Sequence, residues 1–123
     1  MAKILLIEDE AVLRGLLVKL LNTLSHEVVE AGDGEEGLIK LKAEAFDLVL
    51  TDLIMPDKEG LETIQEIRKI RPDLKIIAMS GGGRGSGLDY LVLARQLGAD
   101  QVLAKPFSHQ DLNAAIVALL APT

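Results

Sequence analysis

Five short apolar runs alternate with longer segments of helical periodicity along almost the whole chain, and this alternation limits the possible folds more than any other feature. The runs are Lys3–Ile7, Glu27–Glu30, Asp47–Thr51, Leu74–Met79 and Gln101–Ala104. Most are continuously apolar rather than alternating, which is typical of strands covered on both faces. Parallel strands need a crossover between them, and that crossover is usually a right-handed helical one. The pattern therefore predicts a parallel sheet with helices on both faces.

Five such units in 123 residues fit one domain that covers residues 1–123. We expect the α/β class with a flavodoxin-like, doubly wound, five-stranded parallel sheet, (βα)5, in strand order 2-1-3-4-5. The first helical segment carries an apolar stripe that we expect to face the core. Its members are Val12, Leu13, Leu16, Leu17, Leu20, Leu21 and Leu24. Asp33 and Ser108 are each followed three residues later by an acidic residue, which predicts helix starts at both places.

Charge and composition exclude several classes of function. The chain has 13 basic and 19 acidic residues, a net charge of −6, which argues against direct nucleic-acid binding. It has no cysteine, so thiol redox chemistry and thiolate metal sites are excluded. No apolar run approaches the roughly 18 to 20 residues that span a bilayer, and the first run is too short for a signal peptide. We therefore expect a cytoplasmic protein without membrane contact.

Polar side chains gather where the predicted strands end. Glu8 and Asp9 follow the first strand, Asp52 ends the third, Ser80 follows the fourth and Lys105 follows the fifth. In open sheets of this class, ligands bind beyond the carboxyl ends of the strands where the winding direction reverses. We therefore expect these five side chains to converge on one site.

Three carboxylates in one place repel one another unless a cation joins them. Mg²⁺ suits such a site because it takes oxygen ligands, accepts one or two carboxylates and often shares a phosphate. A carboxylate beside Mg²⁺ and a lysine can attack a phosphoryl donor and form an aspartyl phosphate. In this chemistry Lys105 neutralises the phosphoryl oxygens and Ser80 donates a hydrogen bond to them.

Each residue also has an ordinary interpretation when it is taken alone. Glu8 and Asp9 could cap the helix that follows them, since acidic groups favour helix N-termini. Asp52 could form a turn before Pro56, and Lys105 before a proline could be a solvated lysine. Because these residues all lie at the same end of four predicted strands, a shared phosphoryl site explains them better than separate capping, turn and surface roles.

Four segments carry a family resemblance over essentially the whole chain. They are "ILLIEDE" at 4–10, "DLVLTDLIMPDKEG" at 47–60, "IIAMSG" at 76–81 and "GADQVLAKPF" at 98–107. With these segments in this order and spacing, the chain resembles the receiver domain of bacterial two-component response regulators, of the chemotaxis-type single-domain kind. The resemblance implies a phosphorelay switch rather than an enzyme, one that only assists its own phosphorylation and dephosphorylation.

The resemblance also implies roles for single residues. Asp52 would accept the phosphoryl group from a phosphohistidine of a sensor histidine kinase or a phosphotransfer protein. Asp9, Asp52 and the backbone carbonyl of Ile54 would bind Mg²⁺, and Glu8 would assist. Lys105 would bind the phosphoryl group.

Phosphorylation would then act through a conformational switch. Ser80 would turn toward the phosphoryl group and bias a two-state equilibrium that changes protein partners. The partner would be an effector protein or a covalently attached output domain. Whether the chain stands alone or belongs to a longer protein stays open.

Two departures from the family pattern concern this switch. Val102 occupies a position where the family usually has an aromatic residue. The stretch "SGGGRGSG" at 80–87 lacks the lysine and hydroxyl residue of a phosphate-binding P-loop, so we expect a pliant loop after Ser80.

Three other classes of protein fit the sequence less well. A haloacid-dehalogenase-type phosphatase would need a second aspartate where Ile54 stands. A flavodoxin-like electron carrier would need aromatic residues around a flavin, and the chain has one Tyr, two Phe and no Trp. A degenerate receiver would lack some of the five site groups, all of which are present here.

Overall fold

The computed structural model describes residues 2–53, 60–80, 92, 94–96, 98–105 and 107–120. The strands are β1 (Lys3–Ile7), β2 (Glu27–Ala31), β3 (Leu48–Asp52), β4 (Lys75–Ser80) and β5 (Gln101–Ala104). The helices are α1 (Ala11–Thr23), α2 (Gly34–Ala43), α3 (Gly60–Ile70) and α5 (His109–Leu120). None of the helices in these ranges has the length and apolar character needed to span a membrane. The expected pliant loop after Ser80 lies outside the described residues.

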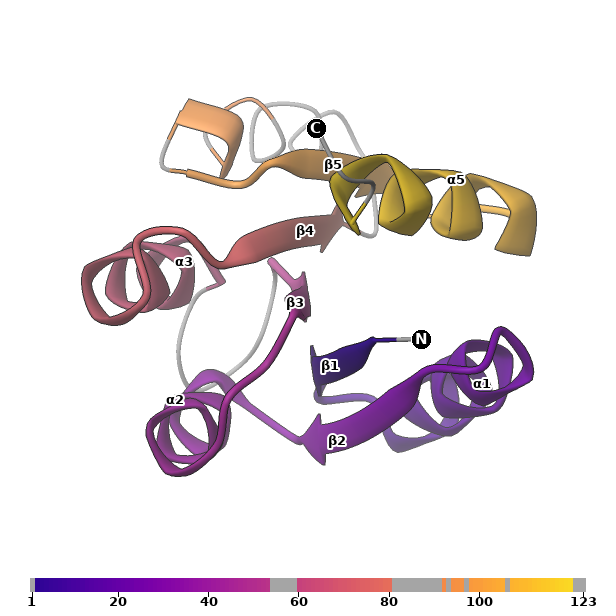
Figure 1. Ribbon diagram of the computed structural model, residues 1–123, viewed down its shortest axis with the longest axis horizontal. Coiled ribbons are helices and arrows are strands. Elements are labelled where there is room, and N and C mark those ends of the chain that lie inside the picture. The colour runs from indigo at the N-terminus through magenta and orange to yellow at the C-terminus, as the bar shows by residue number, and fades with distance from the viewer. Residues whose placement is uncertain are drawn as a thin grey trace.

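The five strands form one parallel sheet in the order β2-β1-β3-β4-β5, which confirms the predicted fold. In Figure 1, α2 and α3 cover one face of this sheet, and α1 and α5 cover the other. β3 and β4 each end one residue later than the sequence predicts. Asp52 and Ser80 are therefore held in the sheet itself, as the last residues of their strands.

The apolar core is divided between the two faces because side chains alternate along each strand. On one face, residues such as Leu5, Val49 and Ile76 pack with residues of α2 and α3. On the other face, residues such as Leu6 and Leu50 pack with residues of α1 and α5. Burial on both faces explains why the strands are continuously apolar, and it leaves the strand ends as the places for polar side chains.

The prediction that the whole apolar stripe of α1 faces the core was wrong for two residues. Leu17 and Leu21 are buried, but Val12 and Leu16 have 73% and 59% of their surface exposed. A helix that lies on a sheet buries one face only, and seven apolar residues within thirteen positions cover more than one face. The spacing of these residues could not show which of them turn outward.

The predicted helix starts at Asp33 and Ser108 are confirmed. The Glu36 N–H donates to Asp33 Oδ1 at 2.8 Å. The Asp111 N–H donates to Ser108 Oγ at 3.0 Å, and the Ser108 N–H donates to Asp111 Oδ2 at 3.3 Å. These bonds satisfy backbone donors that a helix leaves unpaired in its first turn.

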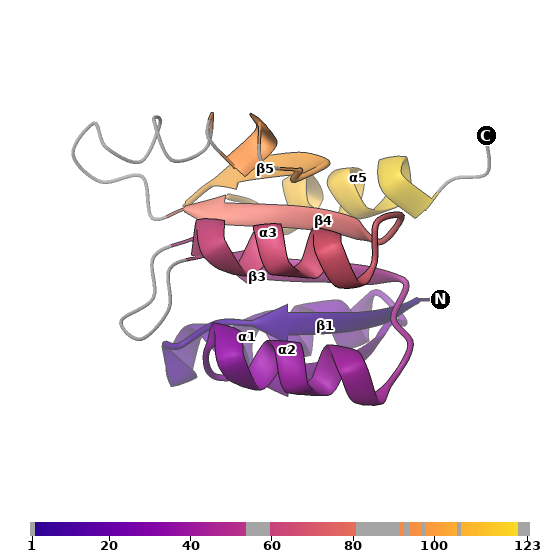
Figure 2. The same ribbon diagram turned by 90° about the vertical axis from the view of Figure 1, so that its left-hand side faces the viewer.

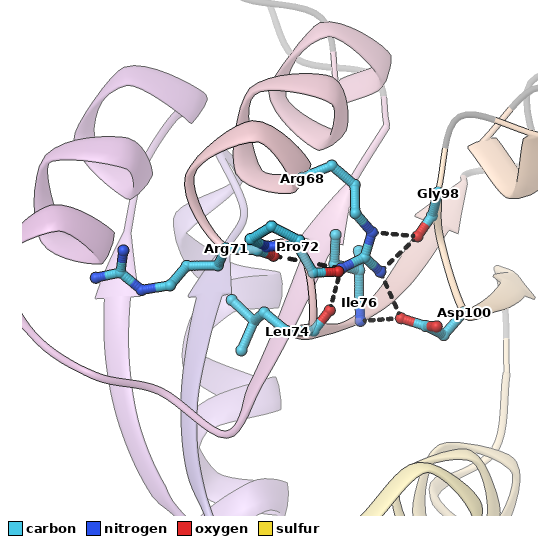
Figure 3. A network of polar contacts seen from close by, with 7 residues as sticks. All are labelled: Arg68, Arg71, Pro72, Leu74, Ile76, Gly98 and Asp100. Carbon is cyan, nitrogen blue, oxygen red and sulfur yellow. Dashed lines mark hydrogen bonds and ion pairs between the residues drawn. The ribbon is translucent and has the colours of Figure 1, made fainter.

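Arg68, near the end of α3, organises the edge of the sheet where β4 and β5 begin (Figure 3). Its guanidinium donates to the Gly98 carbonyl at 2.6 Å, to the Asp100 carboxylate at 2.7 Å and to the Leu74 carbonyl. The same Asp100 oxygen accepts the Ile76 N–H at 2.8 Å. One planar group with five donors therefore joins the turn before β4 to the turn before β5.

The backbone of Gly98 depends on having no side chain. Its φ of +125° is one that L side chains rarely adopt, and an added Cβ would lie 2.8 Å from Arg68 Cγ. We expect Gly98→Ala to lower the free energy of unfolding by about 1 to 3 kcal/mol, measured by urea titration.

Gly15 in α1 provides the matched control for that substitution. Nothing lies within 4 Å of an added Cβ there, so Gly15→Ala should stabilise the protein by about 0.5 to 1 kcal/mol. If Gly98→Ala were as stable as the wild type, the close approach of Arg68 would not constrain this turn.

His26 should make stability depend on pH. Its Nδ1 accepts the Ala2 N–H at 3.1 Å, and burial lowers the pKa of the ring below its ordinary value of 6.5. The unfolded chain therefore binds a proton at this ring more readily than the native protein, so the contribution to stability is lost as pH falls below 6.5. Between about pH 8 and about pH 5, unfolding titrations should show a steeper loss in the wild type than in His26→Gln. An equal loss of stability in the two proteins over this range would contradict the assignment of this pH dependence to His26.

Candidate functional site

Two acidic side chains lie next to each other where β1 and β3 end. Ile7 pairs with Thr51 in the parallel register, so the residues that follow them, Glu8 and Asp52, are neighbours. The Glu8 N–H donates to the Ala31 carbonyl at 3.0 Å and continues the ladder with β2 one residue beyond β1. Strand pairing on both sides therefore fixes the position of Glu8.

Asp9 completes a cluster of three carboxylates. One carboxylate oxygen from each of Glu8, Asp9 and Asp52 lies within 4.8 Å of the other two. Glu8 and Asp52 are buried, with 1% and 5% of their surface exposed, whereas Asp9 is exposed. The cluster thus has a buried side in the sheet and a side that is open to solvent.

Lys105 brings a positive charge to this cluster from the end of β5. Its Nζ lies 3.0 Å from Glu8 Oε1 and 3.4 Å from Asp52 Oδ1. The Lys105 N–H donates to the Ser80 carbonyl at 2.7 Å, which extends the pairing of β4 with β5 and holds the base of the lysine. Side chains from the ends of β1, β3 and β5 thus meet as the sequence predicts, whereas β4 joins them through the Ser80 carbonyl. The lysine ammonium lies closer to Glu8 than to Asp52.

The cluster holds more negative charge than its surroundings favour. Burial raises the pKa of Glu8 above its ordinary value of 4.5, and the charge of the Asp52 carboxylate raises it further. The hydrogen bond from Lys105 acts in the opposite direction because it favours the charged form. An additional cation at this place would relieve the remaining repulsion.

The donor set fits a hard divalent cation. Three carboxylates within 4.8 Å of one another offer the oxygen ligands that Mg²⁺ prefers. The open side at Asp9 leaves room for the water molecules that Mg²⁺ usually retains. These residues therefore match a magnesium site better than a site for softer metals, which prefer nitrogen or sulfur ligands.

The remaining predicted residues have different places in the structure. Ser80 is fully buried at the end of β4, next to Ala104 in the register with β5. Val102 lies opposite Ala78 and is half-buried against the core beneath α2 and α3. Ile54 lies outside the described residues, so its carbonyl stays a prediction.

Two groups that contact the site residues were not predicted from the sequence. The Arg14 guanidinium, on the first turn of α1, donates to the Glu8 carbonyl at 2.7 Å and also contacts Glu30 at 3.3 Å. The Leu53 N–H lies 2.9 Å from Asp52 Oδ1 and helps to orient that carboxylate. Spacing alone gave no signal for either contact, because both depend on the path of the chain after the strands end.

Glu8 and Asp9 do not act as the N-cap of α1. The N-cap residue is Glu10, whose side chain makes no capping hydrogen bond. Instead, Glu8 Oε2 accepts the Glu10 N–H at 3.1 Å. This bond and the one from Lys105 hold both carboxylate oxygens of Glu8 in the site.

The chain matches a known protein family over most of its length. The family model described as the response regulator receiver domain matches residues 4–117. The chain belongs to the receiver domain family. Receiver domains are the phosphoacceptor modules of two-component signalling, so this chain is such a module and not a haloacid-dehalogenase-type phosphatase or an electron carrier.

Individual relatives agree with this assignment. This receiver domain is 42% identical over 120 residues to the transcriptional regulatory protein CpxR of Klebsiella pneumoniae, covering 98% of the chain and 50% of CpxR. It is 39% identical over 118 residues to the probable transcriptional regulator ycf27 of Porphyridium aerugineum, covering 96% and 48%. The receiver domain thus spans about half the length of these curated relatives.

Solved structures share the fold over nearly the full length of the receiver domain. A receiver domain protein from Clostridium thermocellum has a TM-score of 0.90 and 36% identity, with 98% of this chain and 94% of that chain covered. The response regulator TrrA of Thermotoga maritima, in complex with Mg²⁺-BeF, has a TM-score of 0.87 and 35% identity, with coverage of 98% and 100%.

A double-mutant cycle can measure how much the ion pair between Lys105 and Glu8 contributes to the free energy of unfolding. The Glu8 side chain is 1% exposed, so Lys105→Met would leave a buried carboxylate without its cation. We expect this change to cost about 3 kcal/mol of unfolding free energy at neutral pH without divalent cations. In a Glu8→Gln background the same change should cost much less.

The control for this cycle is Lys19→Met, at an exposed position of α1, which should have little effect in either background. Equal costs of Lys105→Met in both backgrounds, measured by urea unfolding, would contradict a stabilising contact between the two side chains.

Proposed function

We propose that Asp52 is the residue that takes the phosphoryl group, from a phosphohistidine of a sensor histidine kinase or of a phosphotransfer protein. The main observation in support of this proposal is the position of the Asp52 carboxylate. Asp52 is buried at the end of the central strand β3, within 4.8 Å of the other two carboxylates and with Lys105 Nζ 3.4 Å away. At that position, the Lys105 ammonium can balance the charge of an incoming dianionic phosphoryl group.

The neighbouring acids are less suited to be the acceptor. Both oxygens of Glu8 already accept hydrogen bonds, one from Lys105 and one from the Glu10 N–H. Asp9 is exposed to solvent, where water would compete with any phosphoryl donor. Asp52 is buried at the end of the central strand β3, within reach of the Lys105 ammonium and of both other carboxylates, so we assign the acceptor role to Asp52 and supporting roles to Glu8 and Asp9.

In the proposed site, Asp9, Asp52 and the Ile54 carbonyl would hold Mg²⁺, and Glu8 would assist. When bound, the ion supplies positive charge for the phosphoryl oxygens. The Asp52 carboxylate forms a bond to phosphorus while the phosphorus–nitrogen bond of the donor breaks. The imidazole leaves with the bonding electron pair and takes up a proton. Lys105 binds the transferred group, and the complex of TrrA with Mg²⁺-BeF supports this ligand class.

Ser80 and Val102 form the proposed switch. Ser80 is buried at the end of β4, and its carbonyl is bonded to the Lys105 N–H, so a change at the lysine reaches β4 directly. We assign its hydroxyl the role of donor to the phosphoryl oxygens. Val102 lies next to Ala78 in the register of β4 and β5. Because a β-branched side chain is restricted at χ1, we expect Val102 to signal the switch less by a rotamer change than an aromatic residue would.

The resulting proposal is a cytoplasmic signalling switch, a single receiver domain over residues 1–123, that assists only its own phosphorylation and dephosphorylation. Its partners are the phosphoryl donor and an effector protein or an attached output domain. The transcriptional regulators among its relatives support an output in gene expression, reached through such a partner and not through nucleic-acid contact by this acidic chain.

Phosphorylation by a small acyl phosphate tests the acceptor directly. With Mg²⁺ and acetyl phosphate, we expect intact-protein mass spectrometry to find one added phosphoryl group in the wild type and none in Asp52→Asn. Asp73→Asn, at an exposed position in the turn before β4, should take up the group like the wild type. An adduct that persists in Asp52→Asn would assign the acceptor role to another residue.

Chelation tests the role of the metal in the same assay. Adding EDTA should abolish phosphoryl uptake by the wild type, because the carboxylates would then repel the incoming group. Uptake that continues at the same rate without a divalent cation would contradict the proposed magnesium site.

A further inference from the structure

A groove between α2 and α3 lies on the outer surface of the protein, away from the carboxylate cluster. The two helices run side by side in front of the sheet in Figure 2, and the groove has a volume of about 510 Å³. Leu38 and Ile39 of α2 and Ile70 of α3 provide its apolar lining. Ile39 has 68% of its surface exposed, so a large apolar side chain stands at the mouth of the groove.

Four charged residues line the groove, Glu35 and Lys42 from α2 and Glu66 and Lys69 from α3, and the two from α2 are arranged symmetrically about its apolar lining. Glu35 and Lys42 line the same groove from α2, and they lie three residues to either side of the pair Leu38 and Ile39. Residues at these spacings share one helix face, because seven residues make about two turns. Both charged side chains are exposed, and neither forms an ion pair with any other described residue.

We propose that this groove is a self-association surface, in which α2 of a second copy packs antiparallel against α2. A two-fold axis between Leu38 and Ile39 would place Glu35 of each copy opposite Lys42 of the other. The same axis would bring the two Ile39 side chains together over the apolar lining. Such an interface is isologous, since one patch serves both copies.

The balance of charges favours a second copy over an unlike partner. A groove built for a different protein can carry one sign of charge that is complementary to the partner. The acid and the base that α2 contributes lie at equal distances from its apolar centre, so the α2 side of the groove is complementary to itself after a two-fold rotation. The one acid and one base from α3 keep the groove balanced in sign. The patch is small, so the contact belongs to the weak, concentration-dependent class.

Reversing the charge of Glu35 or Lys42 tests this proposal, with the dimer dissociation constant measured by sedimentation equilibrium at high protein concentration. The wild type should show a monomer–dimer equilibrium. Glu35→Lys and Lys42→Glu should each raise the dissociation constant at least about tenfold, because each places like charges opposite each other twice in the dimer. No Mg²⁺ or phosphoryl donor is present, so the result does not depend on the proposed phosphotransfer.

Mixing the two variants restores the complementary pairs. One copy then carries lysine at 35 and 42, and the other carries glutamate at both positions, so an equimolar mixture should form a heterodimer at least as readily as the wild type forms its homodimer. The double variant Glu35→Lys/Lys42→Glu should also regain self-association. Circular dichroism and urea unfolding check that each variant is folded.

Two further variants separate this surface from the other exposed apolar positions. Ile39→Asp should abolish the dimer, whereas Val117→Asp on α5, which is 57% exposed, should leave it unchanged. A wild type that stays monomeric at every concentration would assign the groove to an unlike partner and overturn the proposal. So would a dimer that survives both single charge reversals, or a mixture that forms no heterodimer.

Discussion

Burial of the sheet on both faces is the constraint on which the rest of this structure depends. Helices cover both surfaces of the central strands β1, β3 and β4, so polar side chains of these strands can gather only at the two strand ends. At the carboxyl end, three acids and Lys105 form the charged cluster proposed as the phosphoacceptor site. At the opposite end, Arg68 and Asp100 join the turns that lead into β4 and β5. One end thus concentrates unbalanced charge, and the other concentrates hydrogen bonds that fix the strands.

The two ends differ in how well their charges are satisfied. Arg68 donates to several carbonyls and to a carboxylate, so its donors are well matched to their acceptors. The carboxylate cluster is the reverse, because burial and the Asp52 charge raise the pKa of Glu8 even though Lys105 is within 3.0 Å. A site with surplus negative charge gains stability when a cation binds, and the bound cation in turn favours an incoming phosphoryl group. The proposed phosphoryl site therefore lies at the end of the sheet where negative charges still repel one another. The opposite end, around Arg68, is held by paired charges and hydrogen bonds.

Much of the fold and site could be predicted from the sequence, because both follow from patterns local to each segment. Apolar runs and cap pairs identified the strands and two helix starts. The residues after the runs identified the charged cluster of the candidate site, since parallel strands all end at one edge. The outward turn of Val12 and Leu16 could not be predicted, because a stripe wider than one helix face does not say which part meets the sheet. The contacts of Arg14 with Glu8 and of Arg68 with Gly98 join segments whose relative path no local pattern specifies.

By itself, the sequence determined the class of the fold, the edge of the sheet at which charged side chains gather and the kinds of atom that meet there. Residue type and strand order were enough for this, because they depend on periodicity and on the parallel direction of the strands. Only the tertiary structure decided which oxygen each donor reaches: Lys105 contacts Glu8 more closely than Asp52, and Glu10 rather than Asp9 is the N-cap of α1. It also decided that Glu35 and Lys42 flank one groove between α2 and α3. These outcomes depend on ångström-scale packing of side chains from different elements, which spacing along a chain does not encode.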